Sequence, residues 1–174
     1  MGSIPITRSS QPGLHPAPVQ PIDDRPNLGW REWLALPVLG IPAIKAKLDS
    51  GARSSSLHVE DLETLDRGGV LHVRFRVRPR RRSERTVACC APVLDRRRVT
   101  DSSGHCSERW FIRSEVQLAG RRFAVDINLS DRSTMMFPLL LGRLALGGRF
   151  RIDPSLSYTC ARPDRAQSRT QGPA

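Results

Sequence analysis

Aromatic residues are scarce in this 174-residue sequence, at 5% of the chain, and long apolar runs are absent. With so few rings, the chain has few platforms on which unpaired bases could stack, and no helix-turn-helix or zinc-finger pattern is present. No stretch approaches the ~20 apolar residues of a membrane span. The segment Met1–Pro5 has no cationic region leading into an apolar one. We therefore expect a cytoplasmic protein with no membrane partner and with nucleic acid as an unlikely ligand.

The motifs of nucleotide and zinc chemistry are missing as well. No Gly-rich loop ends in Gly-Lys-Ser/Thr, and no His-Glu-x-x-His occurs. The histidines are scattered singly and the cysteines have no two-residue spacing; they are His15, His58, His72, His105, Cys89, Cys90, Cys106 and Cys160. We expect no cofactor and no metal. Adjacent Cys89 and Cys90 make a poor disulfide framework, which favours a reducing compartment.

The chain is long enough for one domain with its own core and too short for two comfortable ones. Residues 1–27 and 162–174 are predicted to be disordered tails because they are polar and proline-rich. Between them, residues 28–161 read as an all-β domain of many short strands. The expected strands are 33–36, 44–48, 70–77, 85–91, 97–101, 109–118, 121–129 and 137–141. Short helical turns are expected near 58–65 and at 143–146.

Positive charge is abundant, with a net charge of +11. Residues 1–27 sum to zero and residues 162–174 to +2, so +11 − 2 leaves +9 on the expected domain. The densest run, from Arg74 to Arg85, holds seven Arg and one Glu. A field of this sign attracts polyanions over a distance, although a solvated hairpin also accounts for this one run.

One turn carries candidate chemistry. Asp49-Ser50-Gly51-Ala52 follows the alternating run 44–48, and about ninety residues later an apolar strand, 138–141, ends in Gly142-Arg143. Further segments in order are 28–33, 44–55, 102–105, 131–132, 136–138 and 150–154. Together they resemble a bacterial family labelled ATP-dependent zinc proteases, whose fold is similar to a retropepsin and whose members look like partners of ligases that append glutamate chains.

The resemblance implies a retropepsin-like lobe that works as a homodimer on an acidic peptide, such as polyglutamate, or on a glutamylated protein. No second Asp-Ser/Thr-Gly turn exists in the chain, so the second acid should come from a second copy. Asp49, Ser50 and Gly51 would form the catalytic turn, with the two Asp49 carboxyls sharing one proton and one water. Substrate contacts are expected from Ala52, Arg53, Lys47, Ser103, Gly104, His105 and Arg143. Residues 98–109 resemble a flap that closes over the substrate.

Two other readings stay open at this point. The chain could be a non-catalytic basic module that binds an anionic protein or nucleic acid, with the Asp turn purely structural. It could also be a metal-dependent peptidase that uses His58 or His105 together with Asp49 as ligands.

Overall fold

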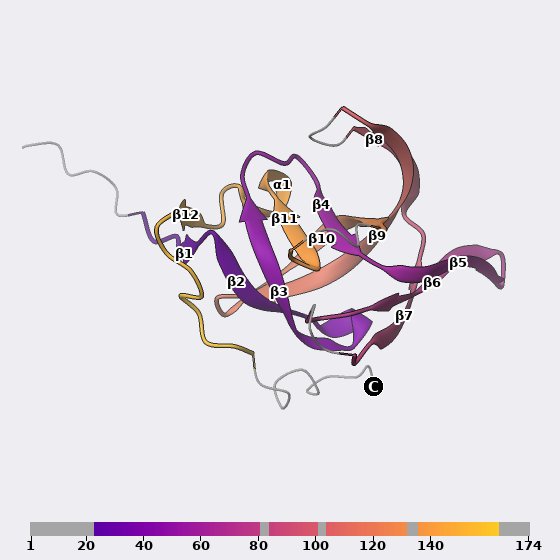
Figure 1. The fold of residues 1–174 in the computed structure, drawn as a ribbon, viewed down its shortest axis with the longest axis horizontal. Coiled ribbons are helices and arrows are strands. Elements are labelled where there is room, and N and C mark those ends of the chain that lie inside the picture. Colours follow the sequence, from indigo (N-terminus) through magenta and orange to yellow (C-terminus); the bar gives the residue numbers. More distant parts are fainter. Residues whose placement is uncertain (1–22, 81–83, 101–103, 132–135, 164–174) are drawn as a thin grey trace, which may run out of the picture.

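The computed structural model describes residues 23–80, 84–100, 104–131 and 136–163, which form a mostly β structure (Figure 1). In chain order the elements are β1 (Asn27–Gly29), β2 (Arg31–Leu36), the 3-10 turn η1 (Pro37–Leu39), β3 (Ile41–Asp49), β4 (Ser55–His58), β5 (Glu60–Arg67), β6 (Val70–Val77), β7 (Val87–Pro92), β8 (Asp95–Thr100), β9 (Cys106–Leu118), β10 (Arg121–Ser130), β11 (Leu139–Gly142), α1 (Arg143–Leu146) and β12 (Arg151–Asp153). The expected all-β class is confirmed. No helix in these ranges has the length and apolarity to span a membrane.

Six strands close into a barrel. Their order is β10, β4, β11, β3, β2 and β9, and β9 pairs again with β10 to complete the circle. β8 extends the sheet beyond β9, while β5, β6 and β7 form a separate three-stranded sheet that projects from the side (Figure 1). Closure leaves β8 as the edge of this sheet, and three consecutive arginines on it keep that edge charged.

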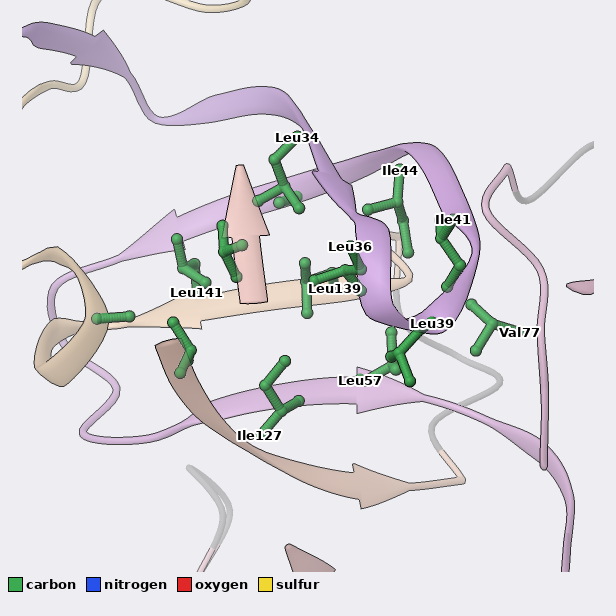
Figure 2. Packing of buried hydrophobic residues seen from close by; sticks show 14 of the residues in the cluster. Leu34, Leu36, Leu39, Ile41, Ile44, Leu57, Val77, Ile127, Leu139 and Leu141 are labelled. Atoms are coloured by element: carbon green, nitrogen blue, oxygen red, sulfur yellow. The ribbon is translucent and has the colours of Figure 1, made fainter. Parts of the chain in front are cut away.

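The alternation along β3 determines which side chains face the barrel interior. Ile44, Ala46 and Leu48 are buried in the core, whereas Lys45, Lys47 and Asp49 alternate with them and are only partly buried. On β11, Leu139 and Leu141 point into the same core (Figure 2). Leu140 is buried but lies outside the core cluster, on the barrel's outer face. The outer face at the ends of β3 and β11 therefore carries the candidate chemistry.

The helical turn expected at 143–146 is confirmed as α1. The one expected near 58–65 is wrong, because this stretch ends β4 and forms most of β5. β5 pairs antiparallel with β6 through a turn in which Gly68 and Gly69 both have positive φ and the Gly69 amide donates to the Asp66 carboxylate. The hairpin supplies β5 with a partner strand, and this outweighs the helical tendency of its acidic residues.

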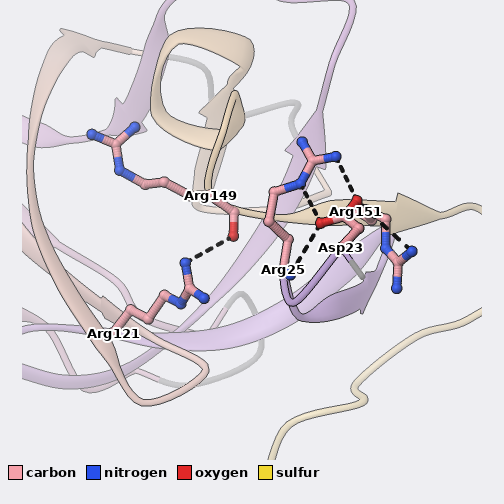
Figure 3. Close-up of polar contacts among 5 residues, drawn as sticks. All are labelled: Asp23, Arg25, Arg121, Arg149 and Arg151. Carbon is pink, nitrogen blue, oxygen red and sulfur yellow. Dashed lines mark hydrogen bonds and ion pairs between the residues drawn. The ribbon is translucent and has the colours of Figure 1, made fainter. Parts of the chain in front are cut away.

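Both ends of the domain meet at the parallel pair β1 and β12. Asp23 forms an ion pair with Arg25 and lies 3.8 Å from Arg151 (Figure 3). Side-chain and backbone hydrogen bonds from Arg25 hold the pKa of Asp23 well below its usual range. Nearby, the Arg121 guanidinium donates to the Arg149 carbonyl. The contacts of Asp23 lie near the surface, whereas β2 and the segment after β12 are joined by a buried side chain.

That connection is Glu32, whose side chain is fully buried. Its carboxyl group accepts hydrogen bonds from the Gly29 amide at 2.9 Å, the Thr159 amide at 2.9 Å, the Thr159 hydroxyl at 2.6 Å and the Cys160 amide at 3.3 Å. One side chain thus fixes both the entry to β2 and the segment near the C-terminus.

Replacing Glu32 with Ala should lower the free energy of unfolding by about 3 kcal/mol or more, because several buried donors lose their acceptor at once. Denaturant unfolding measures the change. The matched control is Glu108→Ala, which removes an ion pair with Arg96 whose side chains are 60% and 55% exposed. It should cost less than about 1 kcal/mol. Equal losses in the two variants would contradict the role given to Glu32.

Candidate active site

Asp49 is the last residue of β3, and its carboxylate is tied to the turn that follows. Oδ1 accepts hydrogen bonds from the Gly51 amide at 3.1 Å and from the Ala52 amide at 3.2 Å. An Asp that bonds to amides two and three residues ahead stabilises a tight turn, which explains why the strand stops here. Ser50 and Gly51 are exposed at the tip, and Asp49 is partly buried beneath them.

The second carboxylate oxygen is held by Lys47, whose ammonium lies 2.9 Å from Oδ2. Burial raises the pKa of Asp49, but the hydrogen bond and charge of Lys47, together with the amides of Ala52 and Gly51, outweigh burial and lower it overall. The carboxyl is therefore held in its ionised form in this single lobe.

β11 and the start of α1 support the turn through close backbone contacts. Gly142 lies opposite Asp49 in the parallel pair of β3 and β11. The Arg143 amide donates to the Ala52 carbonyl at 2.8 Å, and the Leu144 amide donates to the Arg53 carbonyl at 3.2 Å. A Cβ at position 142 would lie only 2.6 Å from the backbone C and O atoms of Ser54, so this close approach requires glycine.

Two guanidinium groups flank the turn. Arg53 and Arg143 are both exposed, and within the described ranges neither forms an ion pair. Arg53 directly follows the Asp49-Ser50-Gly51-Ala52 turn, and Arg143 directly follows Gly142 at the end of β11. Both cations are thus available to an anionic ligand.

A buried polar cluster lies on the same outer face. Leu140 stands opposite Lys47 on one side and Ser56 on the other, so Ser56 is on the Asp49 side of the sheet. The Ser56 hydroxyl donates to Asn128 at 3.0 Å and pairs with the Ser130 hydroxyl at 2.9 Å. The Arg109 guanidinium also donates to Asn128, at 3.2 Å. Nothing in the sequence indicated this cluster, because Ser56 and Asn128 are 72 residues apart.

The hairpin expected over residues 98–109 corresponds to β8 and β9, which pair antiparallel up to Thr100 opposite Cys106. In Figure 1 it curves over the side of the barrel on which β3 ends. Ser103 lies outside the described residues. Gly104 has a positive φ of 84° and His105 is exposed. The expected pair of strands is present, while its role as a flap stays a prediction.

The metal-dependent reading named His58 or His105 with Asp49. His58 Nδ1 instead lies 3.9 Å from Asp131. Across the residues that the structure describes, no three side chains of His, Cys, Asp or Glu gather into a set that could hold an ion.

A closed β-barrel in which the Asp49 turn packs against Gly142 is characteristic of a retropepsin-like lobe. A family model described as retropepsin-like aspartic endopeptidase RimB matches residues 27–163, and the chain belongs to this RimB-like family.

Two curated relatives share this region. A probable alpha-L-glutamate ligase of Desulfotalea psychrophila is 44% identical over 74% of this chain and 28% of its own length. One from Shewanella halifaxensis is 39% identical over 78% of this chain and 30% of its own length. The chain therefore spans less than a third of these relatives. A solved Legionella pneumophila protein of unknown function has the same fold, with a TM-score of 0.66 and 24% identity, covering 77% of this chain and 97% of its own.

Proposed function

We propose that the protein is an aspartic-type endopeptidase whose active site forms between two copies of the chain. The observation that carries the proposal is the Asp49 turn, which presents one carboxyl at the end of β3 and is braced by β11. Each lobe offers one such turn, so a two-fold pair would bring Asp49 of both copies together, as the two-acid chemistry requires.

The chemistry follows from the proximity of two carboxyls. Two like charges in contact cannot both ionise readily, so the pair keeps one proton. The ionised member accepts a proton from a shared water as that water attacks the peptide carbonyl, and the protonated member donates to the carbonyl oxygen. Ser50 would stiffen the paired turns through its hydroxyl, and Gly51 and Ala52 would let the substrate backbone approach.

The substrate that suits this site is an acidic peptide, with polyglutamate as the leading candidate. The expected domain carries a net charge of +9, and Arg53, Arg143 and Lys47 surround the Asp49 turn. The relatives named as glutamate ligases contain a region similar to this chain within a longer protein. A lobe joined to an enzyme that builds glutamate chains is well placed to trim them.

The remaining predicted contacts belong to the flap. Ser103, Gly104 and His105 would close over the bound peptide and exclude water. A glutamylated protein substrate would be met in the cytoplasm, where we place the enzyme.

Turnover of polyglutamate should fall as salt rises, because exposed charges more than about 8 to 10 Å apart are screened near physiological ionic strength. Arg53→Ala should weaken cleavage of polyglutamate, and Arg53→Lys should restore it only in part, since lysine lacks the planar fork that pairs with a carboxylate. Initial rates on polyglutamate and on an uncharged peptide measure both effects.

The uncharged peptide is the control, and its cleavage should respond little to salt or to Arg53→Ala. Equal losses on both peptides would assign Arg53 to the structure of the turn. Salt-independent cleavage of polyglutamate would remove the electrostatic argument. Binding of polyglutamate with no cleavage of any peptide would favour the non-catalytic basic module.

A further inference from the structure

Lys47 is the one cation of the described residues whose ammonium contacts the Asp49 carboxylate, at 2.9 Å. Its side chain is 43% exposed and that of Asp49 is 22% exposed. The ammonium therefore bonds to the candidate catalytic group and is also within reach of a ligand.

The neighbouring cations on β2 and β3 contact aromatic rings. On β3, the Lys45 ammonium lies 5.2 Å from the centre of the Trp33 ring. On β2, Arg31 stands opposite Lys47, but its guanidinium lies 4.7 Å from the ring centre of Trp30 and 5.1 Å from that of Tyr158.

The elements on the other side add no competing contact. Glu32 of β2 is buried and bonds to residues 29, 159 and 160. β11 carries no charged residue between Leu139 and Gly142. Arg53, after the turn, and Arg143, on α1, are exposed and form no ion pair with any described residue. Among the described residues, Lys47 is thus the cation that bonds to Oδ2.

Lys47 lies on the same strand face as Asp49. It shares a row with Leu140 and Ser56 across β3, β11 and β4, on the outer face where Asp49 lies. Leu140 and Ser56 are buried, whereas the Lys47 side chain is 43% exposed. A peptide that brings its scissile bond to Asp49 would therefore meet the Lys47 ammonium with a neighbouring side chain. A carboxylate there would compete with Asp49 for the same cation.

We propose that Lys47 is a positioning residue that couples recognition of an acidic substrate side chain to protonation of the Asp49 pair. In the free protein its ammonium bonds to Asp49 and opposes protonation. A substrate carboxylate draws the ammonium away, and the Asp49 pair takes up one proton from solvent, which completes the acid and base needed for hydrolysis. This inference rests on the proposed peptidase function and adds selection of substrate by charge at the catalytic step.

The positive charge of Lys47 determines the direction in which the pKa of Asp49 changes. Lys47 contributes to lowering the pKa of Asp49 in the free protein, so removing the cation should raise that pKa. The alkaline limit of activity, where the pair loses its shared proton, should then move to higher pH. An acidic substrate should produce the same movement in the wild type by engaging Lys47.

The test compares wild type, Lys47→Met, Lys47→Arg and the matched control Lys45→Met on a glutamate peptide and a glutamine peptide of equal length. For wild type on the glutamate peptide, the alkaline decline of kcat should occur at higher pH than the alkaline decline of kcat/KM. On the glutamine peptide the two declines should occur at the same pH. For Lys47→Met, the alkaline declines of kcat and kcat/KM should occur at the same pH on both peptides, and that pH should be higher than for kcat/KM of the wild type. The preference for the glutamate peptide over the glutamine peptide should fall about two- to fivefold. Lys45→Met and Lys47→Arg should resemble wild type.

A readout independent of turnover separates this inference from the peptidase proposal. Carboxyl carbon NMR of Asp49, assigned with Asp49→Asn, should show a higher pKa in Lys47→Met than in wild type, and a rise in wild type when the glutamate peptide is added. An Asp49 titration that is unchanged by Lys47→Met, or by the glutamate peptide in wild type, overturns the inference even if peptides are cleaved. Both NMR shifts without cleavage of either peptide would support the coupling and reject the peptidase.

Discussion

Replacing Asp49 with Asn is expected to reduce kcat for peptide hydrolysis by about 10²- to 10⁴-fold, because an amide cannot accept the proton of the attacking water. The fold should survive. The amide oxygen of Asn can take the place of Oδ1 and accept from Gly51 and Ala52, and only the contact with Lys47 is lost. Hydrolysis assays beside thermal unfolding measure the two effects separately.

Asp126→Asn is the matched control, because this carboxylate pairs with the exposed Arg113 on the strands β9 and β10. It should retain full activity. Mixing wild type with an equal amount of Asp49→Asn chains provides the test of the dimer, since random pairing leaves about a quarter of the dimers with two carboxyls. Undiminished cleavage by Asp49→Asn would reject the aspartic mechanism, and suppression no greater than simple dilution would reject the shared site.

Replacing Gly142 with Ala is expected to destabilise the domain by about 2–3 kcal/mol and to remove most activity from the molecules that remain folded. The new Cβ would meet backbone atoms of Ser54 at 2.6 Å and the Ala52 carbonyl oxygen at 3.0 Å, so the chain that carries the Asp49 turn must shift. A displacement of this size at a catalytic group can itself cost about 10²-fold.

Gly147→Ala is the appropriate comparison for Gly142→Ala, because its Cβ would have one tight contact, 3.0 Å from the Arg143 carbonyl oxygen, and its φ is −57°. This variant should lose far less stability and activity. Denaturant unfolding gives the stability of both variants, and rates corrected for the folded fraction give the activity. If Gly142→Ala retained wild-type rates, the catalytic function of the Asp49 turn would not depend on its close contact with residue 142.

The sequence predicted the features that depend on local pattern. The alternation of residues 44–48 predicted the strand that carries Asp49, and the apolar run before Gly142 predicted its neighbour, both of which the structure shows as β3 and β11. Residues 68–69 and 119–120 form the turns between β5 and β6 and between β9 and β10, and all four have positive φ. The roles of the predicted site residues stay predictions.

Features that depend on distant contacts were not predictable. The short β1 and β12 have no pattern of their own and exist because they pair with each other. Most of β5 was predicted as a helical turn because of its acidic residues, whereas its strand conformation depends on pairing with β6. The burial of Glu32 depends in part on donors about 127 residues away, which no local pattern indicates. Lys47 and Asp49 are two residues apart on β3 and so share a strand face, but their ion pair also depends on the turn that orients the carboxylate.

The parallel pairing of β3 with β11 also has a consequence for synthesis of the chain. Asp49 and Gly142 are separated by about ninety residues, so a loop of that length must close before the Asp49 turn gains the support of β11. A nascent chain that has emerged from the ribosome only as far as β10 contains the complete Asp-Ser-Gly-Ala turn without its support. The proposed peptidase would therefore be inert until β11 had emerged, and neighbouring nascent proteins would be protected from it until then.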